Sequence, residues 1–175
     1  MPSPHADRGG GALPFPSTAT FRMRLTDILK PENVKLPVEA TDKAGVIDEL
    51  VDHLQANGDL EDVEKVRTSV LERERTRTTG IGDGLAIPHG KTTGVASLVT
   101  AFGRCKEPVD FEAIDGRPVE LVWLLASPTD KTVPHINALA RISKIIAKAD
   151  VRKKLLAAET PRAIYDIVAE EDEKL

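Results

Sequence analysis

The sequence predicts an α/β fold in which a mixed β-sheet is sandwiched between helices, within a single domain. Apolar residues alternate along the chain between extended and helical spacing, which is typical of strands separated by helices. Val119 to Ala126 is almost continuously apolar, as expected of a strand that is buried on both faces. The chain has 175 residues, which is close to one domain of roughly 150 residues.

The N-terminal residues 1–22 differ in composition from the rest of the chain. They hold several prolines and the run Gly9 to Gly11, and they show no periodic apolar pattern. This composition predicts a disordered tail over residues 1–22, followed by one folded domain over residues 23–175. The tail also lacks the apolar stretch that a secretory signal requires.

Apolar spacing and capping residues predict the individual elements. Apolar residues recur at helical spacing within residues 42–57, Thr41 or Asp42 can cap the start of that helix, and Gly58 stands where a helix ends. Asp59 can cap a second helix in the same way. In chain order we expect a strand at Val34–Val38, helices at Asp42–Asn57 and Asp59–Arg75, strands at Ala96–Phe102 and Val119–Ala126, a helix at Thr132–Lys148, and two shorter helices around 150–158 and 160–171. The sheet-facing side of the Thr132–Lys148 helix is predicted as Ile136, Leu139, Ala140, Ser143 and Ile146.

Composition and charge argue against several classes of function. The chain has 24 basic and 28 acidic residues, so we expect no binding to nucleic acid through neutralised phosphates. Cys105 is the only cysteine, which excludes an internal disulfide and fits the reducing cytoplasm. No apolar run approaches the roughly 18 residues of a membrane span, so we expect no direct insertion into a membrane.

The segment from Gly80 to Lys91 is the most informative part of the chain. Its sequence is Gly-Ile-Gly-Asp-Gly-Leu-Ala-Ile-Pro-His-Gly-Lys, and its early glycines allow backbone to approach a partner closely. Pro88 favours an extended residue before it and fixes its own φ. We therefore expect His89 to be presented from a stiff turn, with Gly90 leaving its far side uncrowded.

Familiar motifs for nucleotides and metals fail on their spacing. A Walker A loop that ends in Gly90-Lys91-Thr92 needs its first glycine at position 85, and a dinucleotide fingerprint counted from Gly80 needs a glycine at the same position, which is leucine. A zinc site of His89, His135 and Asp83 lacks the usual spacing of metal-binding histidines. We expect no metal and no cofactor.

A histidine displayed in this way suits nucleophilic chemistry on phosphorus. A neutral imidazole is a good nucleophile near pH 7, because its pKa is about 6.5, and it can hold a phosphoryl group as a phosphoramidate. The phosphoryl oxygens then need cations or N–H donors around them. Candidates are His135 in the first turn of a predicted helix, Arg73 at a helix end, and Lys91. The plain alternatives are structural histidines and a solvated, charged helix end.

The segment Gly80–Lys91 resembles the active-site signature of the fructose/mannitol-type IIA domains of the bacterial sugar phosphotransferase system, and their nitrogen-regulatory paralogue shares that signature. The resemblance covers roughly residues 24–170 and includes Leu25–Leu29, Phe111–Gly116 and the strand through Trp123 followed by His135. It implies an α/β sandwich with a mixed sheet, in agreement with the fold predicted above.

The resemblance also implies roles for single residues. His89 would take a phosphoryl group from the phosphocarrier protein HPr through Nε2, His135 would assist and contact that group, and Arg73 would help to bind it. Asp83 matches an acidic residue of the mannitol branch, shorter by one methylene, where other branches carry asparagine. We assign Asp83, Gly90 and Lys91 to phosphate or partner binding.

Two functions stay open at this point. One is a carrier for sugar transport that passes phosphate from HPr to a IIB domain. The other is a regulatory switch, in which a phosphoryl charge of roughly −1.5 to −2 changes what the surface binds. The chain shows no attached IIB, IIC or HPr-like segment, and Ile87–Lys91 resembles the nitrogen-regulatory class, so the switch is favoured. A paralogue without phosphorylation is disfavoured because His89, His135 and Arg73 are all present.

Overall fold

Six strands form one mixed β-sheet in the structure, a computed structural model that describes residues 23–175. The predicted tail at residues 1–22 lies outside the described residues. The strands are β1 (Val34–Val38), β2 (Gly80–Gly82), β3 (Leu85–Ala86), β4 (His89–Lys91), β5 (Val99–Val109) and β6 (Val119–Ser127). Their order is β1-β5-β6-β3-β2, and β4 also pairs with β6. β5 and β6 are antiparallel, whereas β1 is parallel to β5, and both β3 and β4 are parallel to β6.

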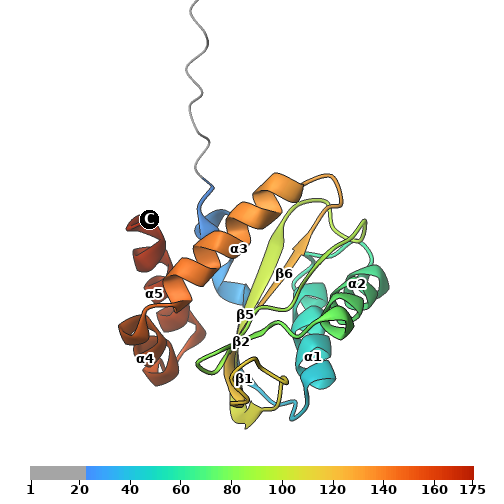
Figure 1. Ribbon diagram of the computed structural model, residues 1–175. Helices are drawn as coiled ribbons and strands as arrows, with labels where there is room; N and C mark the ends of the chain where they lie inside the picture. Colours follow the sequence, from blue (N-terminus) through green and yellow to red (C-terminus); the bar gives the residue numbers. More distant parts are fainter. Residues whose placement is uncertain (1–22) are drawn as a thin grey trace, which may run out of the picture.

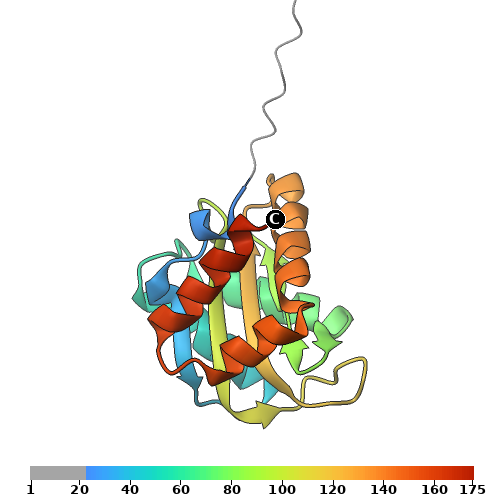
Figure 2. The same ribbon diagram turned by 90° about the vertical axis from the view of Figure 1, so that its left-hand side faces the viewer.

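Two layers of helices cover the sheet (Figures 1 and 2). One layer holds α1 (Lys43–Ala56) and α2 (Val63–Thr76), and the other holds α3 (Thr132–Ile146), α4 (Ala149–Ala157) and α5 (Pro161–Glu173). Two short turns of 3-10 helix, η1 (Leu25–Asp27) and η2 (Pro31–Asn33), precede β1. This arrangement confirms the predicted α/β sandwich. No helix within residues 23–175 is both long and apolar enough to cross a membrane.

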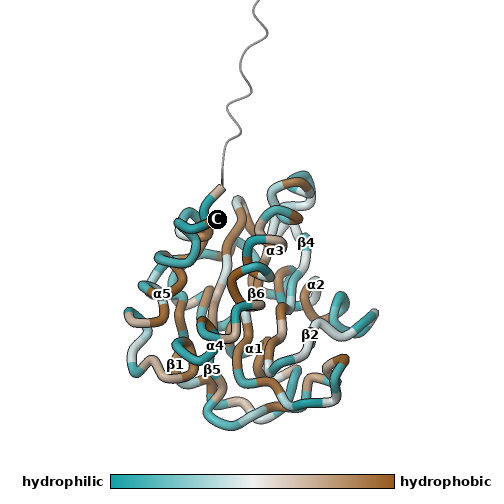
Figure 3. Tube along the Cα trace, turned by 60° about the vertical axis from the view of Figure 1, so that its left-hand side comes forward, coloured by the Kyte–Doolittle hydropathy of each residue, from teal (hydrophilic) through white to brown (hydrophobic). Residues whose placement is uncertain are grey.

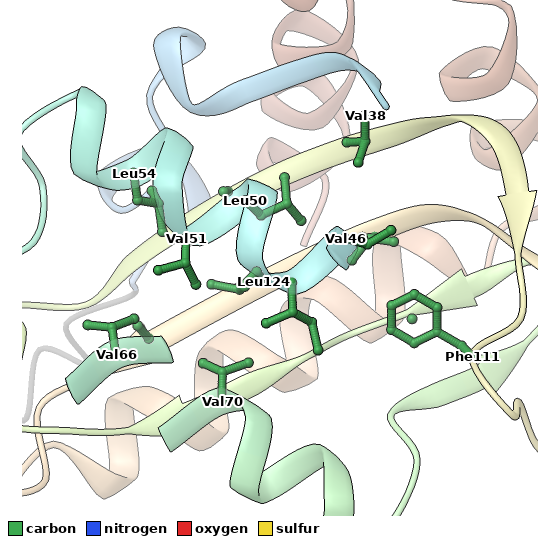
Figure 4. Close-up of a cluster of buried hydrophobic side chains, with 14 of the residues drawn as sticks. Val38, Val46, Leu50, Val51, Leu54, Val66, Val70, Phe111 and Leu124 are labelled. Carbon is green, nitrogen blue, oxygen red and sulfur yellow. The ribbon is translucent and has the colours of Figure 1, made fainter. Parts of the chain in front are cut away.

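The sheet separates two apolar cores, and β6 contributes to both. Val122 and Leu124 pack with α1 and α2, as Figure 4 shows for Leu124, whereas Leu121 and Trp123 pack with the other helices. Phe102 of β5 meets the Trp123 ring edge to face at 5.3 Å. Figure 3 accordingly shows mostly apolar residues along the central strands, whereas apolar and polar residues alternate along the helices. Because successive side chains of a strand point to opposite faces, a strand between two cores has a continuously apolar sequence.

The helix predicted within residues 42–57 is confirmed, but the predicted start of the next helix is wrong. Asp42 caps α1 by accepting a hydrogen bond from the backbone N–H of Gly45 at 2.7 Å. The cap of α2 is Asp62, which accepts from the N–H of Lys65 at 3.1 Å. The carboxylate of Asp59 is engaged elsewhere, because it binds the side chains of Asn33 and Lys30 near η2.

Two later predictions also need correction. β5 continues to Val109, well beyond the predicted end at Phe102. The apolar pattern did not reveal this second half of the strand, because it carries exposed polar residues. The buried side of α3 is His135, Ala138, Ile142, Ile145 and Ile146, whereas Ile136 is 57% exposed. His135 occupies a position of the buried stripe, so the buried face lies about one residue from the predicted one, which is about 100° around a helix.

Candidate active site

His89 and His135 meet at the edge of the sheet where β4 and β6 end. β4 runs parallel to β6, with His89 opposite Leu125 and Lys91 opposite Ser127. The chain then turns back over this edge, and α3 begins at Thr132, so that His135 lies in its first turn. The ring centroids of the two histidines are 5.5 Å apart, and the rings are tilted by 55°. The carboxyl ends of parallel strands are the usual place for ligands in α/β sheets.

A backbone carbonyl fixes the tautomer of His89. Its Nδ1 lies 2.8 Å from the carbonyl oxygen of Ile87. A carbonyl oxygen can only accept, so Nδ1 carries the proton and Nε2 keeps its lone pair. Pro88 separates β3 from β4 and has no N–H to donate, and at this break the Ile87 carbonyl is available to the ring. At the place of the predicted stiff turn, the structure has a two-residue break, Ile87 and Pro88, between the short strands β3 and β4.

The surroundings of His89 favour its neutral form. Partial burial lowers the pKa of the imidazole below its usual 6.5, and the nearby Arg73 guanidinium acts in the same direction. The Ile87 carbonyl and the Glu74 carboxylate oppose this shift and do not cancel it. At neutral pH the Nε2 lone pair is thus free of a proton, which is the state that a nucleophile needs.

Gly90 allows helix α2 to approach β4 closely. A Cβ atom on Gly90 would lie 2.5 Å from Ser69 Oγ, which is too short for a real side chain, and 3.1 Å from the backbone of Ser69 and Val70, which is tight. The Ser69 hydroxyl donates to the Lys91 carbonyl oxygen at 2.8 Å and ties the helix to the strand. Arg73 follows Ser69 by one helical turn, so this close packing brings Arg73 toward His89.

Arg73 and Lys91 bring positive charge to the pocket around the histidines. The pocket has a volume of about 360 Å³ and is lined by Ser69, Arg73, His89, Gly90, Lys91, Thr132, His135, Ile136 and Leu139. The Arg73 guanidinium donates from Nη1 to the Arg77 carbonyl oxygen at 2.8 Å. Lys91 Nζ donates to Thr132 Oγ1, at the start of α3, at 3.3 Å. Both cations therefore belong to the same pocket as His89.

His135 is the buried partner in the pair. Only 6% of its surface is exposed, and its Nδ1 lies 2.6 Å from Ser127 Oγ. Burial lowers the pKa of His135 to about 4, with further contributions from His89 and Lys91. His135 is consequently a neutral imidazole at pH 7 and holds a proton on one nitrogen only.

The structure does not bring Asp83 to this pocket. Asp83 has a φ of 54° in the turn between β2 and β3, and its backbone N–H donates to the Asp115 carboxylate at 3.0 Å. It lines a different pocket together with Arg117 and Arg152. The next residue, Gly84, accepts a hydrogen bond from the N–H of Glu120 at the start of β6, about 16 Å along that strand from the position of His89. The position of Asp83 therefore gives no support to a role in binding a phosphoryl group on His89.

The assembled groups suit a tetrahedral anion that bonds to nitrogen. One neutral histidine offers a lone pair, and a guanidinium, an ammonium and a second histidine surround it. No group of His, Cys, Asp and Glu side chains within residues 23–175 is arranged to hold a metal ion. Sequence reasoning missed Ser69 and Ser127; the available signals were that Ser69 stands one helical turn before Arg73 and that Ser127 ends the apolar run of β6.

Comparison with known proteins identifies relatives over most of the chain. Residues 27–171 match the family model described as phosphoenolpyruvate-dependent sugar phosphotransferase system, EIIA 2. The fructose-specific EIIABC component of Bacillus subtilis is 41% identical over 150 residues, which cover 86% of this chain and 24% of that protein. The nitrogen regulatory protein of Bradyrhizobium diazoefficiens is 36% identical over 148 residues, which cover 84% of this chain and 95% of that protein. The chain thus spans about a quarter of the first relative and nearly all of the second.

Solved structures share the same fold. The nitrogen regulatory protein IIA-Ntr of Neisseria meningitidis superimposes with a TM-score of 0.73 at 28% identity, over 82% of this chain and 98% of that one. The IIA mannitol protein of Escherichia coli, solved in complex with phosphorylated IIB, has a TM-score of 0.70 at 21% identity, over 81% of this chain and 97% of that one. The chain belongs to the EIIA 2 family of the phosphoenolpyruvate-dependent sugar phosphotransferase system.

Proposed function

We propose that this protein is a phosphohistidine carrier in which His89 accepts a phosphoryl group on Nε2 and passes it on. The observation that carries the proposal is the hydrogen bond between His89 Nδ1 and the Ile87 carbonyl oxygen. It leaves the only lone pair of the ring on Nε2, in a residue that lines a pocket with Arg73 and His135. Membership of a phosphoryl-transfer family supports the same chemistry.

The transfer exchanges one nitrogen–phosphorus bond for another. The Nε2 lone pair of His89 attacks the phosphorus atom of a donor phosphohistidine and forms the new bond, while the old bond breaks and its electron pair returns to the donor imidazole. The proton on Nδ1 stays, so the His89 ring gains positive charge, which the Ile87 carbonyl oxygen stabilises. Arg73 and Lys91 supply positive charge to the phosphoryl oxygens, and His135 contacts them. Onward transfer is the same step in reverse.

The proposed donor is an HPr-like phosphocarrier protein, and the proposed acceptor is a IIB domain or a regulatory target protein. The E. coli IIA mannitol protein, which shares the fold, was solved with phosphorylated IIB. We place the protein in the cytoplasm, where the phosphoenolpyruvate that drives the chain of transfers is available. We propose no role in nucleic-acid binding, in keeping with the net charge of −4.

The favoured version is a nitrogen-regulatory-type switch, whose phosphorylated and free forms bind different target proteins. The 36% identity to the nitrogen regulatory protein of B. diazoefficiens over 95% of its length supports this version. The alternative is the IIA subunit of a fructose/mannitol-type sugar transporter. The 41% identity to the fructose-specific EIIABC component of B. subtilis supports that reading.

The carrier role is tested by incubating the protein with phosphoenolpyruvate, the first enzyme of the system and HPr. The expected product is an acid-labile, base-stable phosphate, as phosphohistidine requires. His89→Ala should abolish it. His53→Ala is the matched control, because His53 lies on α1 and binds the Glu32 carbonyl oxygen away from the pocket. Label that persists on His89→Ala contradicts the proposal.

The two versions differ in their onward transfer. The labelled protein is mixed with a fructose-type IIB domain, and the loss of label from the protein is timed. Rapid movement of phosphate to IIB supports the transporter subunit. Retained label, together with faster loading from a nitrogen-type HPr than from a sugar-type HPr, supports the regulatory switch.

A further inference from the structure

Ser127, the last residue of β6, contacts His135, and both side chains are buried. Its Oγ is 2.6 Å from His135 Nδ1. Within the part of the chain that the structure describes, His135 Nδ1 is the one hydrogen-bond partner of this hydroxyl. The direction of this single hydrogen bond therefore decides where the proton of His135 resides.

Proton counting favours one direction. If Nδ1–H donated to Oγ, the hydroxyl hydrogen of Ser127 would be buried without an acceptor, which costs about 1–3 kcal/mol. If the hydroxyl donates to Nδ1, that hydrogen is satisfied and the proton of His135 sits on Nε2, on the ring edge opposite Ser127. A protonated ring would strand the hydroxyl hydrogen in the same way as the first case.

We propose that Ser127 is a positioning residue that holds His135 in the tautomer with its proton on Nε2. The two histidines of the pocket would then be opposite tautomers: His89 with a lone pair on Nε2 and His135 with a hydrogen-bond donor there. This inference rests on the proposed carrier function, and it adds which ring accepts the phosphoryl group and which ring donates a hydrogen bond to it.

The opposite tautomers have two consequences for phosphoryl transfer. The Nε2–H of His135 donates to a phosphoryl oxygen while the ring stays neutral, consistent with its low pKa of about 4. His135 also has no free lone pair, because its Nδ1 lone pair accepts from Ser127. Phosphorylation is thereby directed to His89, although both rings lie in one pocket.

The position of Ser127 is tied to that of His89 through the sheet. Ser127 is paired with Lys91 of β4, and its carbonyl oxygen accepts from the Thr92 N–H at 2.8 Å. The strand that carries His89 is therefore hydrogen-bonded directly to the residue that holds His135. A hydroxyl on a loop would not give this fixed relation between the two rings.

The direct test is NMR of the protein with isotope-labelled imidazole nitrogens at neutral pH. A protonated and an unprotonated imidazole nitrogen have clearly different chemical shifts. We expect His135 to show the proton on Nε2 and His89 to show it on Nδ1. A proton on Nδ1 of His135 overturns the inference even if His89 is phosphorylated normally, whereas loss of His89 phosphorylation with the expected tautomers overturns only the carrier function.

Variants then test whether Ser127 is the cause. In Ser127→Ala, the two His135 nitrogens should move toward intermediate shifts, and the rate of phosphoryl acceptance at saturating donor should fall about tenfold, less than the roughly hundredfold loss on deleting a donor outright. Ser127→Thr keeps the hydroxyl and should restore both. Thr100→Val is the matched control, because it removes a buried hydroxyl that donates to the Leu124 carbonyl oxygen and touches neither histidine. An unchanged His135 spectrum in Ser127→Ala overturns the inference.

Discussion

Arg73 and Arg75 stand two residues apart on α2 and face different surroundings. Arg73 lines the pocket with His89, whereas Arg75 lines a separate pocket with Lys43 and Leu71. A guanidinium binds two phosphoryl oxygens at once, and an ammonium binds as a point charge. We expect Arg73→Lys to keep the fold and to slow phosphoryl acceptance from phospho-HPr by about tenfold or more. Arg75→Lys should leave the rate unchanged; equal slowing by both substitutions would indicate a diffuse basic docking surface instead.

The low pKa of His135 gives a second prediction at the scale of single residues. The folded protein holds His135 neutral down to about pH 4, whereas the unfolded chain binds a proton below about pH 6.5. Between these values the unfolded state binds more protons, so the free energy of unfolding falls as the pH falls. A tenfold change in proton affinity corresponds to about 1.4 kcal/mol, so this one group accounts for a loss of up to about 3 kcal/mol.

The measurement is urea unfolding of the native protein and of His135→Gln across that pH range. The native protein should lose stability more steeply than the variant on acidification, since the variant lacks the titrating ring. The carboxylates are common to both proteins and cancel in the difference. Parallel loss in the two proteins would mean that His135 is protonated in the folded state well above pH 4.

At the scale of elements, the contact between α2 and β4 places Arg73 beside His89. Gly90 is the residue that permits it, because a Cβ there would overlap Ser69. We expect Gly90→Ala to cost about 1–3 kcal/mol of stability and to slow phosphoryl acceptance in the molecules that fold. Gly103→Ala is the control, since its Cβ would press on Val38 and Leu50 in the core under α1. If Gly103→Ala loses a comparable amount of stability but accepts the phosphoryl group at the normal rate, the slowing in Gly90→Ala comes from the pocket. A normal rate of phosphoryl acceptance in Gly90→Ala would contradict this account.

Some helices and strands could be predicted from the sequence pattern, and others could not. β6 and α1 were predictable because their apolar spacing is set by the cores that they face. The cap of α2 was not, because Asp59 and Asp62 suit a helix start equally well and only the tertiary contacts of Asp59 with η2 decide between them. The rotation of α3 was missed because a histidine occupies a buried position of its apolar stripe.

The candidate site shows the same limit. His89, Arg73, Lys91 and His135 were singled out by residue type and motif, and the structure places them around one pocket. Asp83 was included because it matches an acidic residue of the mannitol branch, but the turn between β2 and β3 places it near the other end of β6. Nearness in sequence did not translate into nearness in space. Ser127 carries no motif and became visible only through its distance from His135.

At the scale of the whole molecule, exposed apolar side chains surround the pocket of His89. Ile81 and Ile114 line an adjoining pocket that shares His89, and Val133 and Ile136 project from the first turns of α3; the exposed fractions of all four lie between 41% and 70%. If the proposed donor delivers its phosphoryl group to Nε2 of His89, we expect it to contact these apolar side chains. Desolvated apolar contacts of this kind commonly supply the affinity of such an interface.

This surface predicts how transfer depends on partner concentration. Ile136→Asp should raise the concentration of phospho-HPr needed for half-maximal transfer by about tenfold, because a charge would be buried at the contact. Leu156→Asp is the control, since Leu156 is 39% exposed on α4, beyond the far end of α3 (Figure 1). An equal effect of both substitutions would place the docking surface elsewhere.

The most direct test of the carrier mechanism is to determine which nitrogen holds phosphorus after loading from phosphoenolpyruvate. NMR of the phosphorylated protein with labelled imidazoles identifies the nitrogen that is coupled to phosphorus and the nitrogen that keeps a proton. The expected result is phosphorus on Nε2 of His89, with the proton retained on Nδ1 toward the Ile87 carbonyl oxygen. Phosphorus on Nδ1 of His89, or on His135, would contradict the account.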